Sequence, residues 1–145
     1  MDTQRAMDEA EIRQRIDKLE AAIRVMDLNS VMSIYAPDIV SFDLEPPLQH
    51  VGAEAKKNWL NAFSMYQRPL GYEIRDLTIT VGDDVAFGHG LIRVSGTMTN
   101  GNGTEGWLRS TTCFRKINGM WLIAHDQVSA PLDLGSGRAL LNLEP

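Results

Sequence analysis

The feature that most constrains this chain is a change in the spacing of its apolar residues at Pro69. Before Pro69, apolar residues recur every three or four positions, which is the spacing of one face of an α-helix. After Pro69 they alternate with polar residues, which is the spacing of a half-buried β-strand. Helices followed by strands predict an α+β domain, because a parallel α/β fold would alternate the two.

The N-terminal half of the chain predicts three helices. An apolar stripe over residues 12–26 predicts a first helix of about five turns. Asp27 or Asn29 could cap a second, shorter helix that carries Val31, Ile34 and Tyr35. We expect Pro37 to end that helix, because proline disfavours helical geometry in the residue before it. A third helix is expected over residues 52–66.

The strands predict one curved sheet. A short strand over residues 39–43 precedes the third helix, and Asn118-Gly119 is a strong hairpin signal because both positions of a tight turn need positive φ. Four long antiparallel strands are expected over residues 72–81, 85–97, 105–117 and 120–130. Three helices packed on this sheet would enclose a cone-shaped cavity in a single domain over residues 1–145, with residues 132–145 as a C-terminal tail.

Composition and charge disfavour several classes of protein. The formal net charge is −5 and the 14 basic residues are scattered, which disfavours a nucleic-acid-binding protein. The single cysteine, Cys113, excludes an internal disulfide, and no apolar run approaches the roughly 20 residues that a membrane-spanning helix needs. The polar N-terminus is unlike a secretory signal, so we expect a cytoplasmic protein. Three distant histidines predict no metal site, and no phosphate-binding loop or other cofactor motif is present.

Two stretches of the sequence resemble a known superfamily. They are residues 35–43 (YAPDIVSFD), with a helix opening at Val51-Gly52, and residues 107–131, which contain WLRSTT and RKINGMWLIAHD. The chain resembles the SnoaL-like and ketosteroid-isomerase-like branch of the nuclear transport factor 2-like cone folds. This resemblance implies three N-terminal helices packed on a curved antiparallel sheet around a hydrophobic pocket.

The resemblance also implies a range of functions. Members of the superfamily include isomerases, dehydratases, cyclases, epoxide hydrolases and proteins without catalytic activity. We expect a protein that binds a small hydrophobic ligand, and one hypothesis is cofactor-free acid–base chemistry on a carbonyl compound. The alternative hypothesis is a non-catalytic module that binds a ligand or forms a dimer.

Asp43 is the residue to which the resemblance assigns a role most directly. It falls where ketosteroid isomerase places its general-base aspartate, and burial in an apolar cavity would raise its pKa and make it a competent proton acceptor. The structural alternative is a strand-end aspartate that hydrogen-bonds the adjacent turn. The two oxyanion donors of that enzyme fall near Leu19 and near Thr111 or Thr112, which supply neither a phenol nor a carboxylic acid.

The predicted hairpin register places further candidate catalytic residues. If the tight turn at residues 118–119 sets one continuous register, Asp126 pairs with Thr111. Trp107, Arg109 and Asp126 then share a face. By analogy with ketosteroid isomerase, this face lines the cavity. Arg109 would then pair with Asp126 or Asp43, either as a structural ion pair or to bind an anionic or carbonyl group of a substrate.

The opposite face of the hairpin would carry Phe114, Trp121, Ile123 and His125 on the outside of the sheet. An exposed apolar face of this kind marks an interface, so we expect a homodimer through the outer face. His125 would lie at this interface or, if the register differs by one residue, would enter the cavity as an acid or base.

The remaining pocket candidates are mostly aromatic. Trp59, Phe63 and Trp107 are expected in the pocket wall or, alternatively, in the core. His89 lies between two glycines in a strand, which indicates bending or close backbone approach, and it either enters the cavity or is a core histidine. His50 is expected in a loop before the third helix. The candidate ligand-pocket residues are Phe42, Trp59, Phe63, His89 and Trp107.

Overall fold

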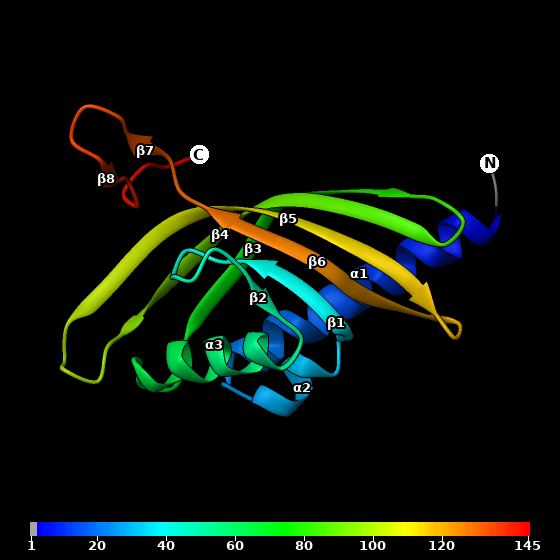
Figure 1. Cartoon of the computed structure of the whole chain (residues 1–145), viewed down its shortest axis with the longest axis horizontal. Helices are drawn as coiled ribbons and strands as arrows, with labels where there is room; N and C mark the ends of the chain where they lie inside the picture. The colour runs from blue at the N-terminus through cyan, green and yellow to red at the C-terminus, as the bar shows by residue number, and fades with distance from the viewer. Residues whose placement is uncertain (1–2) are drawn as a thin grey trace.

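The computed structural model describes residues 3–145 and has its helices on one side of a curved sheet (Figure 1). The helices are α1 (Thr3–Arg24), α2 (Leu28–Met32) and α3 (Ala53–Ser64). The buried apolar residues of α1 run from Ile12 to Ile23 along the predicted apolar stripe. Asp27 caps α2, because its side chain accepts a hydrogen bond from Ser30 N at 3.2 Å. The three predicted helices are therefore confirmed within the described residues.

The main sheet within residues 3–145 has six strands and is mixed rather than wholly antiparallel. The strands are β1 (Tyr35–Phe42), β2 (His50–Val51), β3 (Gly71–Val81), β4 (Val85–Thr97), β5 (Gly103–Ile117) and β6 (Met120–Ser129). Their order is β2-β1-β6-β5-β4-β3, and the four long strands form the predicted antiparallel meander. β1 pairs with β6 in parallel, so the prediction of a wholly antiparallel sheet is wrong. Parallel neighbours cannot be joined by a tight turn. The chain between β1 and β6, which contains β2, α3 and β3 to β5, is long enough for this pairing.

β1 begins earlier than predicted and contains Pro37. Because α2 already ends at Met32, the prediction that Pro37 ends this helix is wrong. The pairing of β1 with β6 is irregular between Tyr35 and Val40, and Pro37 lies in this interval. A proline has no N–H to offer a sheet, so it is tolerated where the pairing is interrupted.

The turn between β5 and β6 has the predicted geometry, but the register changes further along the strands. Asn118 and Gly119 have φ values of 50° and 80°, as a tight hairpin turn requires. The register shifts between Phe114 and Cys113, because Ala124 is an extra residue of β6 without a partner in β5. This is a β-bulge, which the alternation of the sequence does not reveal.

The bulge changes which residues of β6 point inward. Trp121 and Ile123 lie in the core before it, whereas Asp126 and Val128 line the cavity after it. Asp126 is paired with Thr112 and not, as predicted, with Thr111. The predicted face assignment of β5 is wrong, because it extended one register along the whole hairpin.

The apolar residues predicted on the outside of the sheet form its core. Phe114, Trp121 and Ile123 are 1%, 0% and 1% exposed. The indole Nε1 of Trp121 donates to Asp8 Oδ1 of α1 at 3.1 Å, and Lys116 Nζ lies 3.2 Å from the same oxygen. The residues from which the sequence predicted a dimer interface are therefore buried within one chain.

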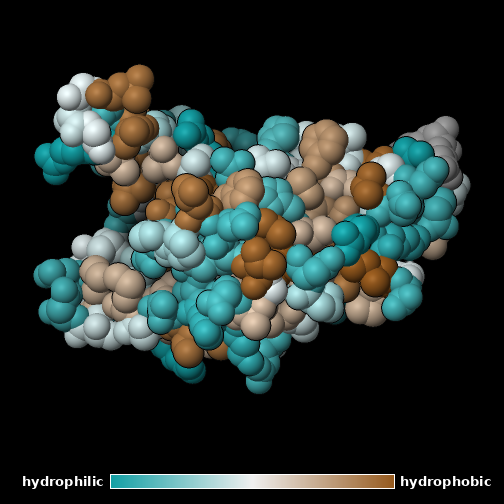
Figure 2. Space-filling model, viewed as in Figure 1, coloured by the Kyte–Doolittle hydropathy of each residue, from teal (hydrophilic) through white to brown (hydrophobic). Residues whose placement is uncertain are grey.

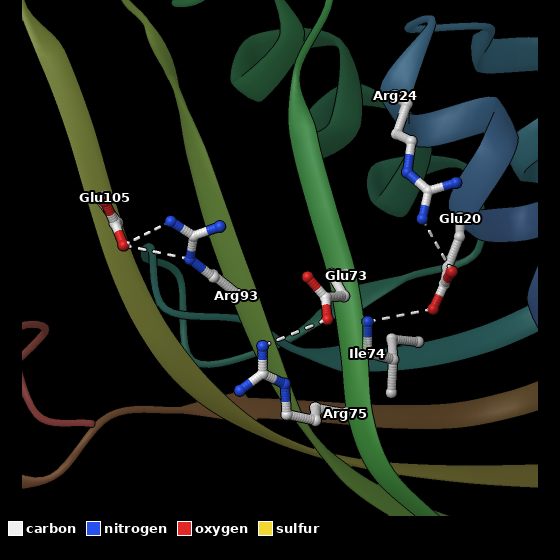
Figure 3. A network of polar contacts seen from close by, with 7 residues as sticks. All are labelled: Glu20, Arg24, Glu73, Ile74, Arg75, Arg93 and Glu105. Carbon is white, nitrogen blue, oxygen red and sulfur yellow. Dashed lines mark hydrogen bonds and ion pairs between the residues drawn. The ribbon is translucent and has the colours of Figure 1, made fainter. Parts of the chain in front are cut away.

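α1 also holds the edge strand β3 (Figure 3). Glu20 Oε1 accepts a hydrogen bond from Ile74 N at 3.0 Å, and Arg24 Nε donates to Tyr72 O at 3.0 Å. Arg24 pairs with Glu20 at 3.0 Å. These contacts occupy backbone groups at the sheet edge, and they fix Tyr72 and Ile74 where both line the cavity.

After β6 the chain forms a small hairpin, in which β7 (Leu132–Asp133) pairs with β8 (Arg138–Ala139). Figure 1 shows this hairpin standing clear of the helices, and Figure 2 shows hydrophobic residues at its end. Leu134 is 88% exposed there. The chain then returns to the sheet, where Leu141 O accepts a hydrogen bond from Trp107 N at 3.0 Å.

Candidate functional site

A cavity of about 250 Å³ lies between the helices and the sheet. Its wall is mostly apolar and includes the side chains of Tyr35, Trp59, Phe63, Tyr66 and Tyr72. The volume exceeds the roughly 150 Å³ of a cavity that binds benzene, and it is just below the roughly 300 Å³ at which drug-sized sites begin. The cavity can therefore hold a small organic molecule of one or two rings.

Asp43 lines this cavity and forms a polar pair with His50. Asp43 follows β1 and lines the cavity with its side chain 21% exposed, whereas the His50 side chain is 7% exposed. Pairing of Ser41 with His50 between β1 and β2 brings the two residues together. His50 Nδ1 lies 2.9 Å from Asp43 Oδ2, at ion-pair distance but without the linear geometry of a hydrogen bond. Burial raises the pKa of Asp43, and the neighbouring His50 opposes that rise.

A second carboxyl, that of Asp126 on β6, lies beside two aromatic donors. Trp59 Nε1 donates to Tyr35 Oη at 2.9 Å, and Tyr35 Oη donates to Asp126 Oδ2 at 3.1 Å. Asp126 Oδ1 is buried and has no hydrogen-bond partner among residues 3–145. Burial raises the pKa of Asp126, the Ser41 hydroxyl opposes this rise, and the charge of Asp43 adds to it. The neutral acid is therefore favoured more here than in water.

The two phenols of the cavity wall stay protonated. Burial raises the pKa of Tyr35 and of Tyr72, and the negative charge of Asp126 adds to both shifts. Tyr35 and Tyr72 can therefore give and accept hydrogen bonds in the cavity, but neither is a suitable base. The carboxyls of the cavity wall are therefore the better proton acceptors at neutral pH.

The cavity, its covering helices and the curved sheet agree with a known family. The sequence profile of the SnoaL-like domain matches residues 12–133. The chain belongs to the SnoaL-like family. A search among curated proteins found no match to it.

Solved structures share the fold of this SnoaL-like domain. An NTF2-like protein of unknown function from Pseudomonas putida is 32% identical, with a TM-score of 0.88 over 97% of this chain and 98% of that chain. A ketosteroid isomerase-like protein from Erwinia carotovora atroseptica is 24% identical, with a TM-score of 0.72 over 83% and 93%. The association domain of C. elegans CaMKII is 15% identical, with a TM-score of 0.69 over 89% and 100%. At identities below 25% the likeness shows the fold alone.

The SnoaL-like domain brings four of the predicted site residues to the cavity. Asp43, Asp126, Trp59 and Phe63 line it, and the rings of Trp59 and Phe63 from α3 lie 5.5 Å apart between centroids. His89 also borders the cavity, but it is an exposed residue of β4 between two buried positions. Its backbone therefore lines the wall while its side chain lies on the outer face of the sheet.

Two predicted residues lie on the outer face instead. Arg109 is exposed, and its Nε donates to Ser129 Oγ at 3.1 Å rather than pairing with an aspartate. The guanidinium of Arg75 lies 4.8 Å over the ring of Trp107. The predicted placement of Arg109 and Trp107 in the cavity is wrong, because the bulge in β6 moves Asp126 to the opposite face from the odd-numbered residues of β5.

His125 and Phe42 are also outside the cavity. His125 Nδ1 contacts Val40 O, to which it can donate, and its ring lies 4.6 Å from that of Phe42 at 78°. Phe42 is exposed because it alternates with Ser41, which is buried beside Asp126. His125 therefore lies on the outer face, the first of its two predicted positions, and neither His125 nor Phe42 lines the cavity.

Three residues of the site do not follow from the sequence reasoning. Tyr35, expected near the end of the second helix, begins β1, and His50, expected in a loop, belongs to the two-residue strand β2. No sequence signal marks so short a strand. Tyr72 alternates with Ile74 in a predicted strand, and this alternation could have identified it. The cavity wall does contain a phenol and a carboxyl, those of Tyr35 and Asp126, although not at the positions of Leu19 and Thr112.

The described residues offer little other reactive chemistry. Within residues 3–145, no group of three His, Cys, Asp or Glu side chains is arranged to hold a metal ion. No helix in this part of the chain is both long and apolar enough to cross a membrane. Burial raises the pKa of the Cys113 thiol, which opposes its action as a nucleophile.

Proposed function

We propose that this SnoaL-like domain binds a small hydrophobic carbonyl compound and catalyses proton transfer on it without a cofactor. The observation that carries the proposal is a mostly apolar cavity lined by three carboxyls, two of which, those of Asp43 and Asp126, have different surroundings. Asp43 lies beside His50, and Asp126 lies beside Tyr35. Different surroundings allow one carboxyl to act as a base and the other as an acid. The reaction class is isomerisation, dehydration or cyclisation through an enol.

In the proposed step, the Asp43 carboxylate removes a proton from a carbon next to the carbonyl. The C–H electron pair forms a carbon–carbon double bond, the carbonyl π pair moves onto oxygen, and Asp126 donates its proton to that oxygen. The enol is then bound beside a protonated Asp43 and an ionised Asp126. In a substrate with a β,γ double bond, Asp43 delivers its proton to the γ carbon while the enol hydrogen returns to Asp126, which completes an isomerisation. In a β-hydroxy substrate, the hydroxyl takes the proton of Asp43 and leaves as water while the enol hydrogen returns to Asp126, which completes a dehydration.

Deuterium exchange into 1-indanone tests this step without knowledge of the natural substrate. Proton NMR in D₂O follows loss of the hydrogens next to the carbonyl. Asp43→Asn should slow protein-catalysed exchange by about 10²–10⁴-fold, because an amide cannot accept the proton. Asp38→Asn is the matched control, since Asp38 lies on β1, is exposed and pairs with Arg115 at 3.1 Å. Equal exchange by Asp43→Asn and the wild-type protein would reject the proposal.

We also propose that the domain forms a homodimer through the outer face of the sheet. Val85 and Phe87 are 57% and 48% exposed, and Phe87 lies on this face. Strand pairing sets Phe87, Cys113, His125 and Val40 side by side across four strands. An apolar row of this kind is typical of an interface. The fold shared with the CaMKII association domain is consistent with assembly.

A further inference from the structure

The β7–β8 hairpin, here called the arm (residues 132–139), has a fixed shape of its own. The Asp133 side chain accepts hydrogen bonds from Gly135 N at 3.3 Å and from Ser136 Oγ at 2.7 Å, and its carbonyl oxygen accepts one from Gly137 N at 2.7 Å. Gly137 has a φ of 74°, in the region that favours glycine. The turn at the end of the arm is therefore determined by its own residues and does not need packing against the rest of the chain.

The base of the arm is tied to the main sheet. Leu140 N donates to Pro131 O at 2.8 Å, and Trp107 N donates to Leu141 O at 3.0 Å. Gly106 permits this close approach, because a Cβ at that position would lie only 3.0 Å from Leu141 O. The arm is consequently held in one orientation where it leaves the end of β6.

The arm carries apolar side chains that residues 3–145 leave uncovered. Leu132 is 52% exposed and Leu134 is 88% exposed. Figure 1 shows the arm on the side of the sheet away from the helices. An isolated hairpin of two short strands is at best marginally stable in water. A preformed hairpin with an uncovered apolar end is therefore typical of a segment that binds another molecule.

An apolar patch that could receive the arm lies toward the other end of the sheet. Val85 and Phe87 are 57% and 48% exposed and, two positions apart on β4, both point to the outer face. Phe87 is level with Cys113, whereas the arm follows Ser129, which is level with Arg109. The four residue steps from Arg109 to Cys113, at about 3.3 Å each, separate the two levels by roughly 13 Å. The arm of one chain therefore leaves the patch of the same chain uncovered.

We infer that the arm of each copy in a dimer packs on the outer face of the other copy, with Leu132 and Leu134 against Val85 and Phe87. A twofold interface uses the same two surfaces twice. Copies whose strands run in roughly opposite directions bring the arm end of each sheet over the patch end of the other. The inference rests on the proposed homodimer and adds a second contact region to it. The net charge of −5 opposes the alternative, in which the arm binds an anionic lipid surface.

A disulfide between two chains tests this contact. In a Cys113→Ala background, Leu134→Cys combined with Val85→Cys should form a covalent dimer under mild oxidation, as measured by electrophoresis without reductant. A disulfide needs Cα atoms within about 7 Å, which the separation along the strands excludes within one chain. Each single cysteine variant in the same background is a matched control and should remain uncrosslinked. No covalent dimer in the double variant, or equal crosslinking in either single variant, would overturn the inference.

A charge at the end of the arm tests its contribution to the affinity. Leu134→Asp should raise the dissociation constant of the dimer at least about tenfold in analytical ultracentrifugation, because a symmetric pair loses two apolar contacts. Leu134 is 88% exposed within one chain, so the circular dichroism of the variant should match that of the wild type. Leu60→Asp is the matched control, since Leu60 is 56% exposed on α3, and should leave the dissociation constant unchanged. Equal dissociation constants for Leu134→Asp and the wild-type protein would also overturn the inference.

The arm contact and the proposed homodimer fail in different ways. If the wild-type protein is a monomer at micromolar concentration, the homodimer is rejected and the arm contact with it. If the wild-type protein and Leu134→Asp form equally stable dimers while Phe87→Asp is a monomer, the arm contact alone is rejected and the homodimer through the outer face stands.

Discussion

His50 Nδ1 lies 2.9 Å from Oδ2 of Asp43, a residue that lines the mostly apolar cavity. The two residues come together because β2 pairs with the end of β1. Burial raises the pKa of Asp43, and His50 opposes the rise. His50 therefore extends the pH range in which Asp43 is ionised and able to accept a proton.

Replacing His50 should move the pH dependence of the proposed reaction. His50→Gln removes the influence that lowers the pKa of Asp43, so the acidic limb of the deuterium-exchange profile should shift to higher pH. Exchange should fall most at the low end of the profile, where less of Asp43 is ionised. His89→Gln is the matched control, because the side chain of His89 is exposed on the outer face. Superimposable profiles for His50→Gln and His89→Gln would contradict the role given to His50.

Asp126 should make the folded protein less stable as the pH rises. Burial raises its pKa above the ordinary value of 3.8, so the folded state keeps a proton that the unfolded chain has already released. The free energy of unfolding therefore falls as the pH rises from about 3.8 through the raised pKa. Asp126→Asn should remove this loss and stabilise the protein by about 0.5–2 kcal/mol at neutral pH.

Urea denaturation across the acidic and neutral range measures this effect. The gain from Asp126→Asn should shrink as the pH falls toward 3.8, where the carboxyl is protonated in both states. Asp38→Asn, at an exposed position on β1, should show no comparable gain. An Asp126→Asn protein less stable than the wild type at neutral pH would refute the prediction.

Asp8 should have the opposite dependence on pH. The Trp121 indole lowers the pKa of Asp8 above all, with Lys116 and Gln4 contributing through hydrogen bonds while burial opposes them. A lowered pKa in the folded state stabilises the protein above the ordinary value of 3.8, and the stabilisation is lost as the pH falls through the lowered pKa. Asp8→Asn should flatten the acidic limb of stability against pH.

The indole contact itself can be tested with Trp121→Phe. This change leaves a buried carboxylate short of one donor and should cost about 1–3 kcal/mol in the free energy of unfolding at neutral pH. The Trp121→Phe, Asp8→Asn double variant should show a cost that is not the sum of the two single changes, because the residues share one hydrogen bond. Additive costs would mean that the contact contributes nothing of its own.

The parts of the fold that local physics determines could be predicted from the sequence. The apolar stripe predicted α1, and Asn118-Gly119 predicted the tight turn between β5 and β6. Both features depend on neighbouring residues alone. The parallel pairing of β1 with β6 and the bulge at Ala124 depend on contacts between distant segments, and no local sequence pattern predicts them. These non-local features are where the predictions failed.

The candidate site shows the same division. The resemblance to ketosteroid isomerase predicts Asp43 as a site residue at the end of the entry strand, and Asp43 does line the cavity. A continuous register predicts Arg109 in the cavity, on the same face as Asp126. The extra residue in β6 changes the face of every later pair, so Arg109 lies on the opposite face from Asp126. Tyr35 and His50 were not identified because their importance depends on where β1 and β2 pair, which alternation alone cannot tell.

Phe87 provides the test of the proposed homodimer. It is 48% exposed on the outer face of β4, in the row that also contains Cys113 and His125. Phe87→Asp would place a charge at one end of this row and should convert a dimer into a monomer, because an unpaired buried charge at an interface is strongly unfavourable. Size-exclusion chromatography with light scattering gives the mass directly.

Leu60→Asp is the matched control, since Leu60 is 56% exposed on α3, away from the sheet's outer face, and should leave the dimer intact. A wild-type monomer at micromolar concentration, or a dimer that survives Phe87→Asp, would mean that this face is not where two copies meet.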